Sequence, residues 1–173
     1  MRQAIEQLQA SKIRELANAG LGRSDVLAFW FGESDEVTPD FIRQAAIDSL
    51  HAGETFYAHN LGLPELRESI SAEIVKRHGA DIGSDRIAVT SGGVNALMLA
   101  VQALVNPGDE VLAITPVWPN LVAQPRIMGA HLRTLSLQVV NGGWQLDLGA
   151  LIAAIGPQTK LLILNAKLSL ASV

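Results

Sequence analysis

The sequence has no cysteine among its 173 residues, which excludes disulfide bonds and thiolate chemistry. It also lacks a long apolar run, since no stretch approaches the ~18 uninterrupted apolar residues of a membrane span. The first residues contain no apolar core of a secretion signal. We therefore expect a protein of the reducing cytoplasm that binds no membrane.

Basic charge is scarce as well. The chain has 13 Lys and Arg against 17 Asp and Glu, a formal net charge of -4, and no Lys/Arg cluster, so we expect no nucleic-acid surface. The four histidines show no metal-ligand spacing, and we expect no metal site. No Gly-x-Ser-x-Gly motif supports a serine nucleophile.

A composition of 49% hydrophobic and 17% charged residues indicates a globular protein with a proper core. We predict a helical arm over residues 1–80, with helices over 2–19, 38–51 and 64–78 and a strand or extended segment over 26–31. Strands and helices then alternate over residues 81–173. The expected strands are 87–90, 110–115, 131–137 and 161–164, and the expected helices 94–105, 120–128 and 147–155. This alternation predicts an α/β fold with a mainly parallel sheet.

A glycine pair follows the first expected strand of this second part. The strand 87–90 ends before Gly92-Gly93, and a helix is expected from Val94 onward. Glycine permits backbone torsions that other residues avoid, and it lets main-chain N–H groups approach a ligand. Because those groups lie at the positive end of a helix, the pattern predicts a phosphate site. A simple tight turn is the alternative.

Trp118 follows the next expected strand, residues 110–115. Ligands of open α/β sheets gather at the carboxyl ends of the strands. Trp118 therefore emerges beside the glycine turn, where its flat face could stack on a heteroaromatic ring. A tryptophan packed in the core is the alternative.

Two common phosphate-binding motifs fit poorly. A P-loop requires Gly-Lys-Ser/Thr after the glycines, which this chain lacks. The dinucleotide motif G-x-G-x-x-G is absent too, and Asp109 and Glu110 stand at the start of the next strand rather than near its end. A different α/β nucleotide-binding protein stays open as an alternative, which competition with nicotinamide dinucleotides would reveal.

Several motifs together, in order over roughly residues 10 to 166, resemble the class I/II pyridoxal-phosphate aminotransferases of fold type I, and most of all their aspartate-aminotransferase-like branch. The motifs are Phe31-Gly32-Glu33, Thr38-Pro39, Tyr57 to Arg67, Thr90 to Gly93 with Ala96-Leu97, Pro107 to Val111, and Pro116-Val117-Trp118. The resemblance implies pyridoxal 5'-phosphate as cofactor, an amino acid and a 2-oxo acid as substrates, and a homodimer.

By this resemblance, Gly92 to Val94 would bind the cofactor phosphate, mainly through backbone N–H groups, and Trp118 would stack on the pyridine ring. Tyr57 would reach the phosphate of the neighbouring subunit, although a packed aromatic near a turn is its plain alternative. Gly32 would lie beside the substrate carboxylate. The family commonly has Gly-Glu-Pro-Asp where this chain has Gly-Glu-Ser-Asp.

The resemblance fails at the end of the chain. After Asn165-Ala166 the family continues toward Asn-Pro-Thr-Gly, whose asparagine would fall on Ser169, so its role is not carried over. The family's Schiff-base lysine lies beyond residue 173. We nominate no catalytic residue, because none of the lysines is in the family's lysine motif: Lys12, Lys76, Lys160 and Lys167. We expect a truncated or frameshifted, catalytically incomplete aminotransferase chain, or alternatively a non-catalytic fragment that binds the cofactor or pairs with a full-length subunit.

Overall fold

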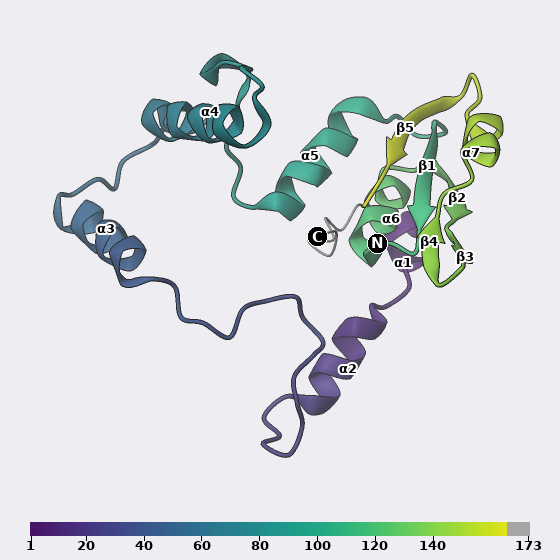
Figure 1. Cartoon of the computed structure of the whole chain (residues 1–173), viewed down its shortest axis with the longest axis horizontal. Coiled ribbons are helices and arrows are strands. Elements are labelled where there is room, and N and C mark those ends of the chain that lie inside the picture. Colours follow the sequence, from purple (N-terminus) through teal and green to yellow (C-terminus); the bar gives the residue numbers. More distant parts are fainter. Residues whose placement is uncertain (166–173) are drawn as a thin grey trace. The chain divides into compact units, whose positions relative to one another are not determined.

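The computed structural model describes residues 1–165, which form two compact units. The helical unit comprises residues 12–91, and the sheet unit comprises residues 1–11 together with the chain from Gly92 onward (Figure 1). The chain passes from one unit to the other between Ser91 and Gly92. The predicted domains are residues 1–80 and 81–173. The two compact units are defined by contacts within this chain alone, so this division into domains stays a prediction.

The helical unit contains α2 (Lys12–Gly20), α3 (Asp40–His51), α4 (Pro64–His78) and the short 3-10 helix η1 (Ser84–Arg86). The predicted helix 64–78 is confirmed at both ends. Pro64 stands in the first helical turn, where its missing N–H costs no bond, and Gly79 ends the helix in the left-handed conformation at φ 66°.

The single helix predicted over residues 2–19 is wrong. Two helices, α1 (Gln3–Glu6) and α2, take its place, and they belong to different units. Within the sheet unit, the Arg2 Nη2 atom donates to the Ile127 carbonyl oxygen at 2.8 Å. The first turn of the chain packs in the sheet unit, and this packing overrides the local preference of residues 2–19 for one continuous helix.

The helix predicted over residues 38–51, α3, begins later than expected. The helix begins at Asp40, with Pro39 in the N-cap position and no side-chain capping bond. The helix itself ends at His51, as predicted.

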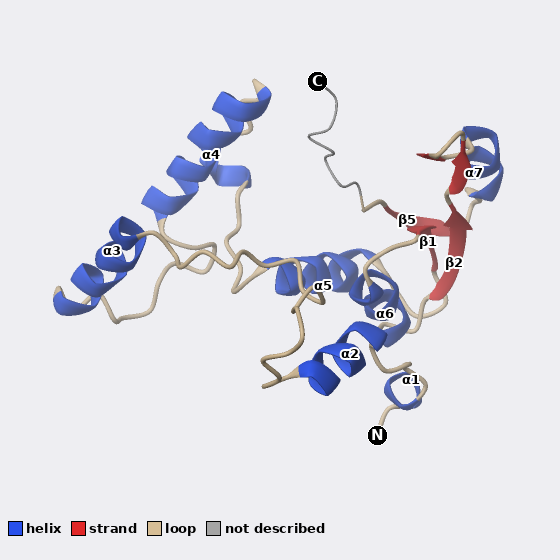
Figure 2. Cartoon of the chain, turned by 60° about the horizontal axis from the view of Figure 1, so that its bottom comes forward, coloured by secondary structure: helices blue, strands red, loops and turns tan. Residues whose placement is uncertain are grey.

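The sheet unit contains α5 (Gly93–Leu104), β1 (Glu110–Thr115), α6 (Pro119–Ile127), β2 (His131–Ser136), the hairpin β3 (Gln138–Val140) and β4 (Gly143–Gln145), α7 (Leu148–Ala154) and β5 (Thr159–Ile163). Within the described residues, the main sheet has the order β2-β1-β5, and β1 pairs in parallel with both neighbours. This confirms the predicted parallel sheet. Helix α6 contacts β1 and β2, and α7 contacts β2; Figure 2 shows these helices and strands by colour.

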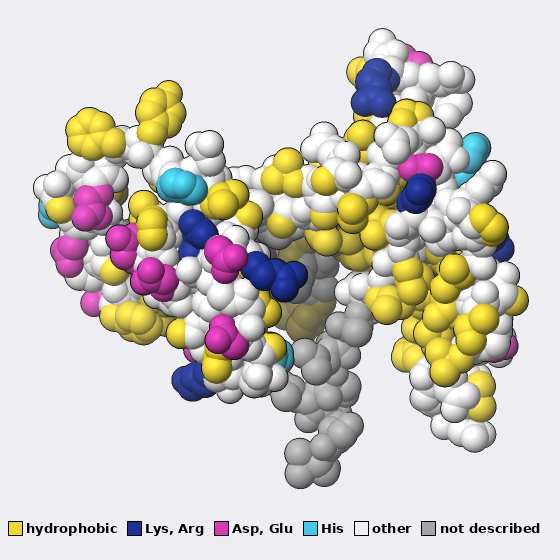
Figure 3. All heavy atoms as spheres, turned by 90° about the horizontal axis from the view of Figure 1, so that it is seen from above, with side chains coloured by type: hydrophobic (Ala, Val, Ile, Leu, Met, Phe, Trp, Pro, Cys, Tyr) yellow, Lys and Arg dark blue, Asp and Glu magenta, His cyan; other side chains and the backbone are white. Residues whose placement is uncertain are grey.

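The core lies around β1, the middle strand. Val111, Leu112 and Ala113 are each at most 1% exposed, because strands flank β1 on both sides and helices cover its faces. From α5 and the residue after it, Val101 and Val105 pack against Val111. Many apolar side chains nevertheless lie at the surface of the chain (Figure 3).

The strand predicted over residues 87–90 is wrong. These residues run without strand pairing, and Val89 N donates a single backbone bond to Leu61 O, at 2.9 Å. A strand requires a ladder of backbone bonds to a neighbour, and the described segment beside Val89 is a loop. Residues 26–31 likewise contain no strand. The chain bends at Val26, Trp30 and Phe31, and Phe29 N donates to Leu27 O at 3.1 Å, so the segment is not continuously extended either.

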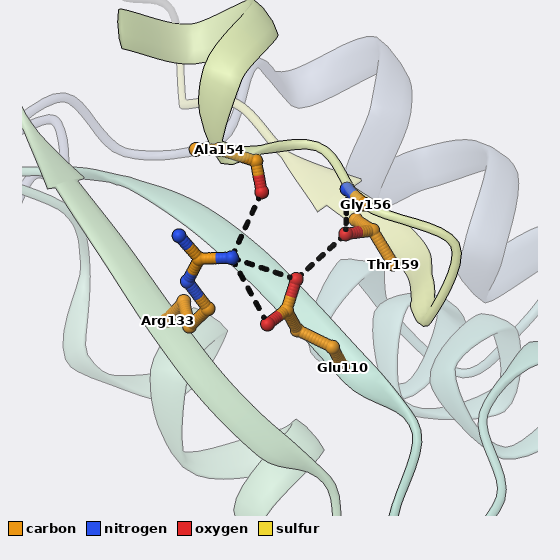
Figure 4. Close-up of polar contacts among 5 residues, drawn as sticks. All are labelled: Glu110, Arg133, Ala154, Gly156 and Thr159. Atoms are coloured by element: carbon orange, nitrogen blue, oxygen red, sulfur yellow. Dashed lines mark hydrogen bonds and ion pairs between the residues drawn. The ribbon is translucent and has the colours of Figure 1, made fainter.

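Four residues join the amino ends of the three strands (Figure 4). Thr159 Oγ1 donates to Glu110 Oε1 at 2.6 Å, and Arg133 Nη1 lies 3.2 Å from Glu110 Oε2. The same Arg133 atom donates to the carbonyl oxygen of Ala154 at 3.0 Å. The Glu110 carboxylate thus links β1 to β2 and β5, and through Arg133 to the end of α7. The Glu110 side chain is only 15% exposed, so these contacts are partly shielded from water.

We expect Glu110→Gln to destabilise the sheet unit most near neutral pH. The hydrogen bond from Thr159, followed by the bond and charge of Arg133, lowers the pKa of the Glu110 carboxyl from its usual 4.5. A carboxyl with a lowered pKa in the folded state stabilises the fold above its unfolded pKa, and this stabilisation is lost as pH falls through the folded value. Urea unfolding from pH 7 down to pH 3 should therefore show the difference from wild type shrinking below about pH 4.5.

Glu6→Gln is the matched control for Glu110→Gln. Its carboxylate is 58% exposed and 3.6 Å from the terminal amine, so it should change stability little at any pH. A constant stability difference for Glu110→Gln across this pH range would contradict the assignment.

Candidate functional site

The glycine pair forms the start of α5. Gly92 is the N-cap residue and Gly93 the first helical residue. The first backbone bond of the helix runs from Ala96 N to Gly92 O, at 3.0 Å, so the N–H groups of Gly93, Val94 and Asn95 belong to the open first turn. No acidic side chain lies in this turn. The helix end therefore offers N–H donors and partial positive charge to an anion.

Only one of the two predicted reasons for glycine can apply at Gly92. Gly92 has φ 161° and ψ 164°, an extended conformation open to any residue, so unusual torsions are not required. A Cβ atom at Gly92 or Gly93 would meet no described atom within 4 Å. The positions that side chains would take are therefore open, which is compatible with a phosphate close to the N–H groups of this turn.

Trp118 is the N-cap residue of α6, three residues after the end of β1, and its side chain is 39% exposed. The peptide bond between Thr115 and Pro116 is cis. Trp118 thus lies at the carboxyl edge of the sheet, as predicted, and it is partly accessible rather than buried in the core. Its indole ring offers a flat apolar face to a ligand.

A buried glutamine joins the two helices that carry these residues. Gln124 of α6 is 5% exposed, and its Nε2 atom donates to the carbonyl oxygen of Val94 at 3.1 Å. Gln124 was not predicted as a site residue, because a polar residue in a helix is usually exposed and no short motif marks it. Its spacing from the buried Leu121 and Pro125, which places all three on one helix face, was the only available signal.

Tyr57 and Gly32 belong to the helical unit. The Tyr57 side chain is fully exposed, as is most of the neighbouring Phe56 at 92%. Gly32 lies in an exposed loop where a Cβ atom would meet no described atom within 4 Å. Beside it, the Arg14 guanidinium carbon lies 4.8 Å from the centre of the Phe31 ring.

Two residues of the motif from Tyr57 to Arg67 have structural roles that the sequence did not reveal. Arg67 is part-buried and donates twice to the Ser84 carbonyl oxygen, at 3.1 and 2.7 Å. Gly62, at φ 94°, lies against Val89, where a Cβ atom would come within 2.7 Å. Together they hold the segment that leads to the glycine turn against α4 and its preceding loop.

The family "Aminotransferase class I and II" matches residues 25–166. The chain belongs to the class I and II aminotransferases. It is 35% identical over 156 residues to a probable aspartate/prephenate aminotransferase of Aquifex aeolicus, covering 90% of this chain and 39% of that relative. It is 35% identical over 159 residues to a probable aspartate aminotransferase of Methanocaldococcus jannaschii, covering 92% and 41%. The chain thus spans about 40% of the length of these curated aminotransferases.

Solved aminotransferase structures share the fold. A mutant of Thermus thermophilus aspartate aminotransferase matches with a TM-score of 0.86 and 29% identity, over 96% of this chain and 44% of that one. N-succinyldiaminopimelate aminotransferase of Mycobacterium tuberculosis matches with a TM-score of 0.73 and 34% identity, over 76% and 35%. The predicted fold class, the N-terminal part of this aminotransferase fold, is confirmed.

Aminotransferases of this aspartate-aminotransferase-like type use pyridoxal phosphate. The start of α5 fits that cofactor's phosphate, since it combines N–H donors, no acidic side chain and open space above two glycines. Lys167 and Ser169 lie outside the described residues. Within residues 1–165, no helix is long and apolar enough to span a membrane, and no three His, Asp or Glu side chains form a metal site.

Proposed function

We propose that this aminotransferase chain binds pyridoxal phosphate with Gly92, Gly93 and Val94 on the phosphate and Trp118 on the ring. The open first turn of α5 carries the proposal, because its N–H groups are oriented for an anion and no Cβ covers them. The part-exposed indole of Trp118 supports it, since α6, which it begins, is bonded to that first turn. Both elements belong to one compact unit.

The proposed activity of the whole protein is transfer of an amino group from an amino acid to a 2-oxo acid. When bound, pyridoxal phosphate supplies an aldehyde that takes up the amino group and a ring that accepts negative charge from the amino acid. This chain's backbone would hold the phosphate, and Trp118 would fix the plane of the ring. The names of the relatives suggest aspartate as the first donor to test, by following oxaloacetate release. The 173-residue chain alone has no lysine in the family's lysine motif and is expected to release none. No release by a longer protein that contains this chain would count against the activity.

Tyr57 and Gly32 are assigned roles on the family pattern. A fully exposed tyrosine next to an exposed Phe56 is suited to contact with another subunit, which supports a homodimer in which Tyr57 reaches the partner's cofactor phosphate. Open space above Gly32 suits the close approach of a substrate carboxylate. A cytoplasmic location stays a prediction that rests on the absence of cysteine.

We expect Trp118→Leu to weaken cofactor binding about tenfold, because leucine cannot stack on the ring. Pyridoxine 5'-phosphate is a suitable probe, since it has the cofactor's ring and phosphate but an alcohol in place of the aldehyde and so cannot react with surface lysines. Titration calorimetry with wild type and variant measures the two dissociation constants.

Trp144→Leu provides the control for this measurement. Trp144 belongs to the same unit, in β4, and is 64% exposed, so its replacement should leave the affinity for pyridoxine 5'-phosphate unchanged. Equal losses in both variants, or tighter binding of nicotinamide dinucleotides than of the pyridoxine phosphate, would contradict the proposed cofactor site.

A further inference from the structure

We propose that Gln124 is a positioning residue that sets the spacing between the phosphate-binding turn and the ring-stacking tryptophan. The inference rests on the proposed cofactor site, and it adds a residue that touches neither phosphate nor ring. Its basis is one buried contact, the 3.1 Å bond from Gln124 Nε2 to the carbonyl oxygen of Val94.

The contact joins the two elements of the site directly. Val94 is the second residue of α5, within the turn whose N–H groups face the phosphate. Gln124 is on α6, six residues after Trp118, which corresponds to about 9 Å along a helix axis. This bond restrains the distance between the two helices, whereas apolar packing alone permits helices to slide.

The surroundings of Gln124 make the bond strong and directional. The side chain is 5% exposed and shares its helix face with the buried Leu121 and Pro125. Within residues 1–165, its Oε1 atom has no hydrogen-bond partner. Burying an amide with an unpaired oxygen is costly, and methionine or leucine would pack there without that cost. The bond to Val94 is therefore the one interaction in the described chain that favours glutamine over an apolar residue at this position.

The spacing matters only to a ligand that touches both elements. A pyridoxine phosphate has a fixed distance between ring and phosphate, so it loses affinity when the turn and Trp118 drift apart. Inorganic phosphate contacts the turn alone and is insensitive to that distance. A residue that acts through spacing should thus affect the two ligands differently, whereas a residue that only holds α5 in place should affect both.

Gln124→Met tests this with a side chain of similar volume and no donor. We expect about fivefold to tenfold weaker binding of pyridoxine 5'-phosphate, as for the loss of one buried hydrogen bond, and unchanged binding of inorganic phosphate. Calorimetry measures the first ligand and phosphorus NMR line broadening the second. Gln102→Met, at an exposed position of α5, is the matched control and should change neither affinity.

The possible results distinguish the positioning role of Gln124 from the cofactor site itself. Equal weakening of both ligands, or none, in a folded Gln124→Met chain overturns the positioning role and leaves the cofactor site standing. Failure of the wild-type chain to bind pyridoxine 5'-phosphate overturns both proposals together. If Gln124→Met does not fold, hydrogen exchange of the Gln124 side-chain amide in the wild type decides. It should slow with pyridoxine 5'-phosphate and not with inorganic phosphate, and equal rates with both ligands would overturn the role.

Discussion

Gly92→Asp should abolish most of the cofactor affinity while leaving the fold intact or slightly more stable. An aspartate at the N-cap accepts a hydrogen bond from the second or third N–H of the helix, those of Val94 and Asn95, which are the donors proposed for the phosphate. Its charge also repels the phosphate, by about 4 kcal/mol for unit charges about 4 Å apart near a protein surface. Allowing for solvent screening, we expect about a 100-fold rise in the dissociation constant of pyridoxine 5'-phosphate, measured by calorimetry.

Two variants separate charge from size in this experiment. Gly92→Asn has the shape and capping ability of aspartate without its charge, so its loss of affinity should be much smaller. Gln102→Glu adds the same charge to an exposed position of α5, about 15 Å further along the helix, and should have little effect. Stability and affinity are expected to change in opposite directions in Gly92→Asp. Unchanged affinity in that variant would rule out the turn as the phosphate site.

The α/β body could be predicted because its local signals agree with its packing. The run Glu110 to Thr115 is apolar and bounded by turns, and it became β1, the strand buried on both faces. The helices expected between the strands predicted parallel pairing, and β1 pairs in parallel with both of its neighbours. Where the hydrophobic pattern, the length and the burial of a segment all indicate the same element, the sequence alone is sufficient to predict it.

Two expected elements were wrong because their outcome depends on distant partners. Residues 87–90 have the composition of a strand, yet the described chain beside Val89 is a loop, so no ladder forms. Residues 2–19 have one helical pattern, but the first turn is bonded through Arg2 to Ile127, 125 positions further along the chain. Local periodicity contains no information on either contact.

Some residues of the candidate site could likewise be predicted from the sequence, and others could not. Trp118 could be found from its position after β1, and the Gly92-Gly93 turn from its position before an expected helix. The structure places them at the starts of α6 and α5. Gln124 and Arg67 could not, because each acts on a backbone carbonyl of a residue that is remote in sequence. Polar side chains that bind main-chain oxygens leave no pairwise motif, so only three-dimensional contacts reveal them.

Opposite ends of β1 have separate tasks. Its amino end holds Glu110, bonded to Thr159 and Arg133, and its carboxyl end leads through Thr115 to Trp118. Substitutions at the amino end should alter the stability of the fold without altering ligand contacts. Substitutions at the carboxyl end should alter ligand contacts without altering stability. The middle of β1, where Leu112 lies, is part of the core that holds both ends of the strand in place.

Leu112→Ala should cause the largest loss of stability among these variants. The side chain is 1% exposed and sits in the central strand, between Arg133 and Leu162 in the sheet register. Removing buried methyl groups loses their transfer free energy and leaves a cavity, and Leu-to-Ala changes in cores cost roughly 2–5 kcal/mol. We expect a loss of about 3 kcal/mol in the free energy of unfolding, a large share of the ~5–15 kcal/mol typical of a domain. Urea unfolding followed by circular dichroism measures it.

Leu148→Ala, in the same unit but 64% exposed, should change the free energy of unfolding by no more than about 0.5 kcal/mol. Because a ligand that binds only the folded chain stabilises it by an amount set by its affinity, saturating pyridoxine 5'-phosphate should raise the stability of wild type and Leu112→Ala equally. The same addition should raise that of Gly92→Asp far less. A Leu112→Ala chain that unfolds like wild type would show that the core around β1 is not where the stability of this unit resides, and the separation between its two ends would then lose its basis.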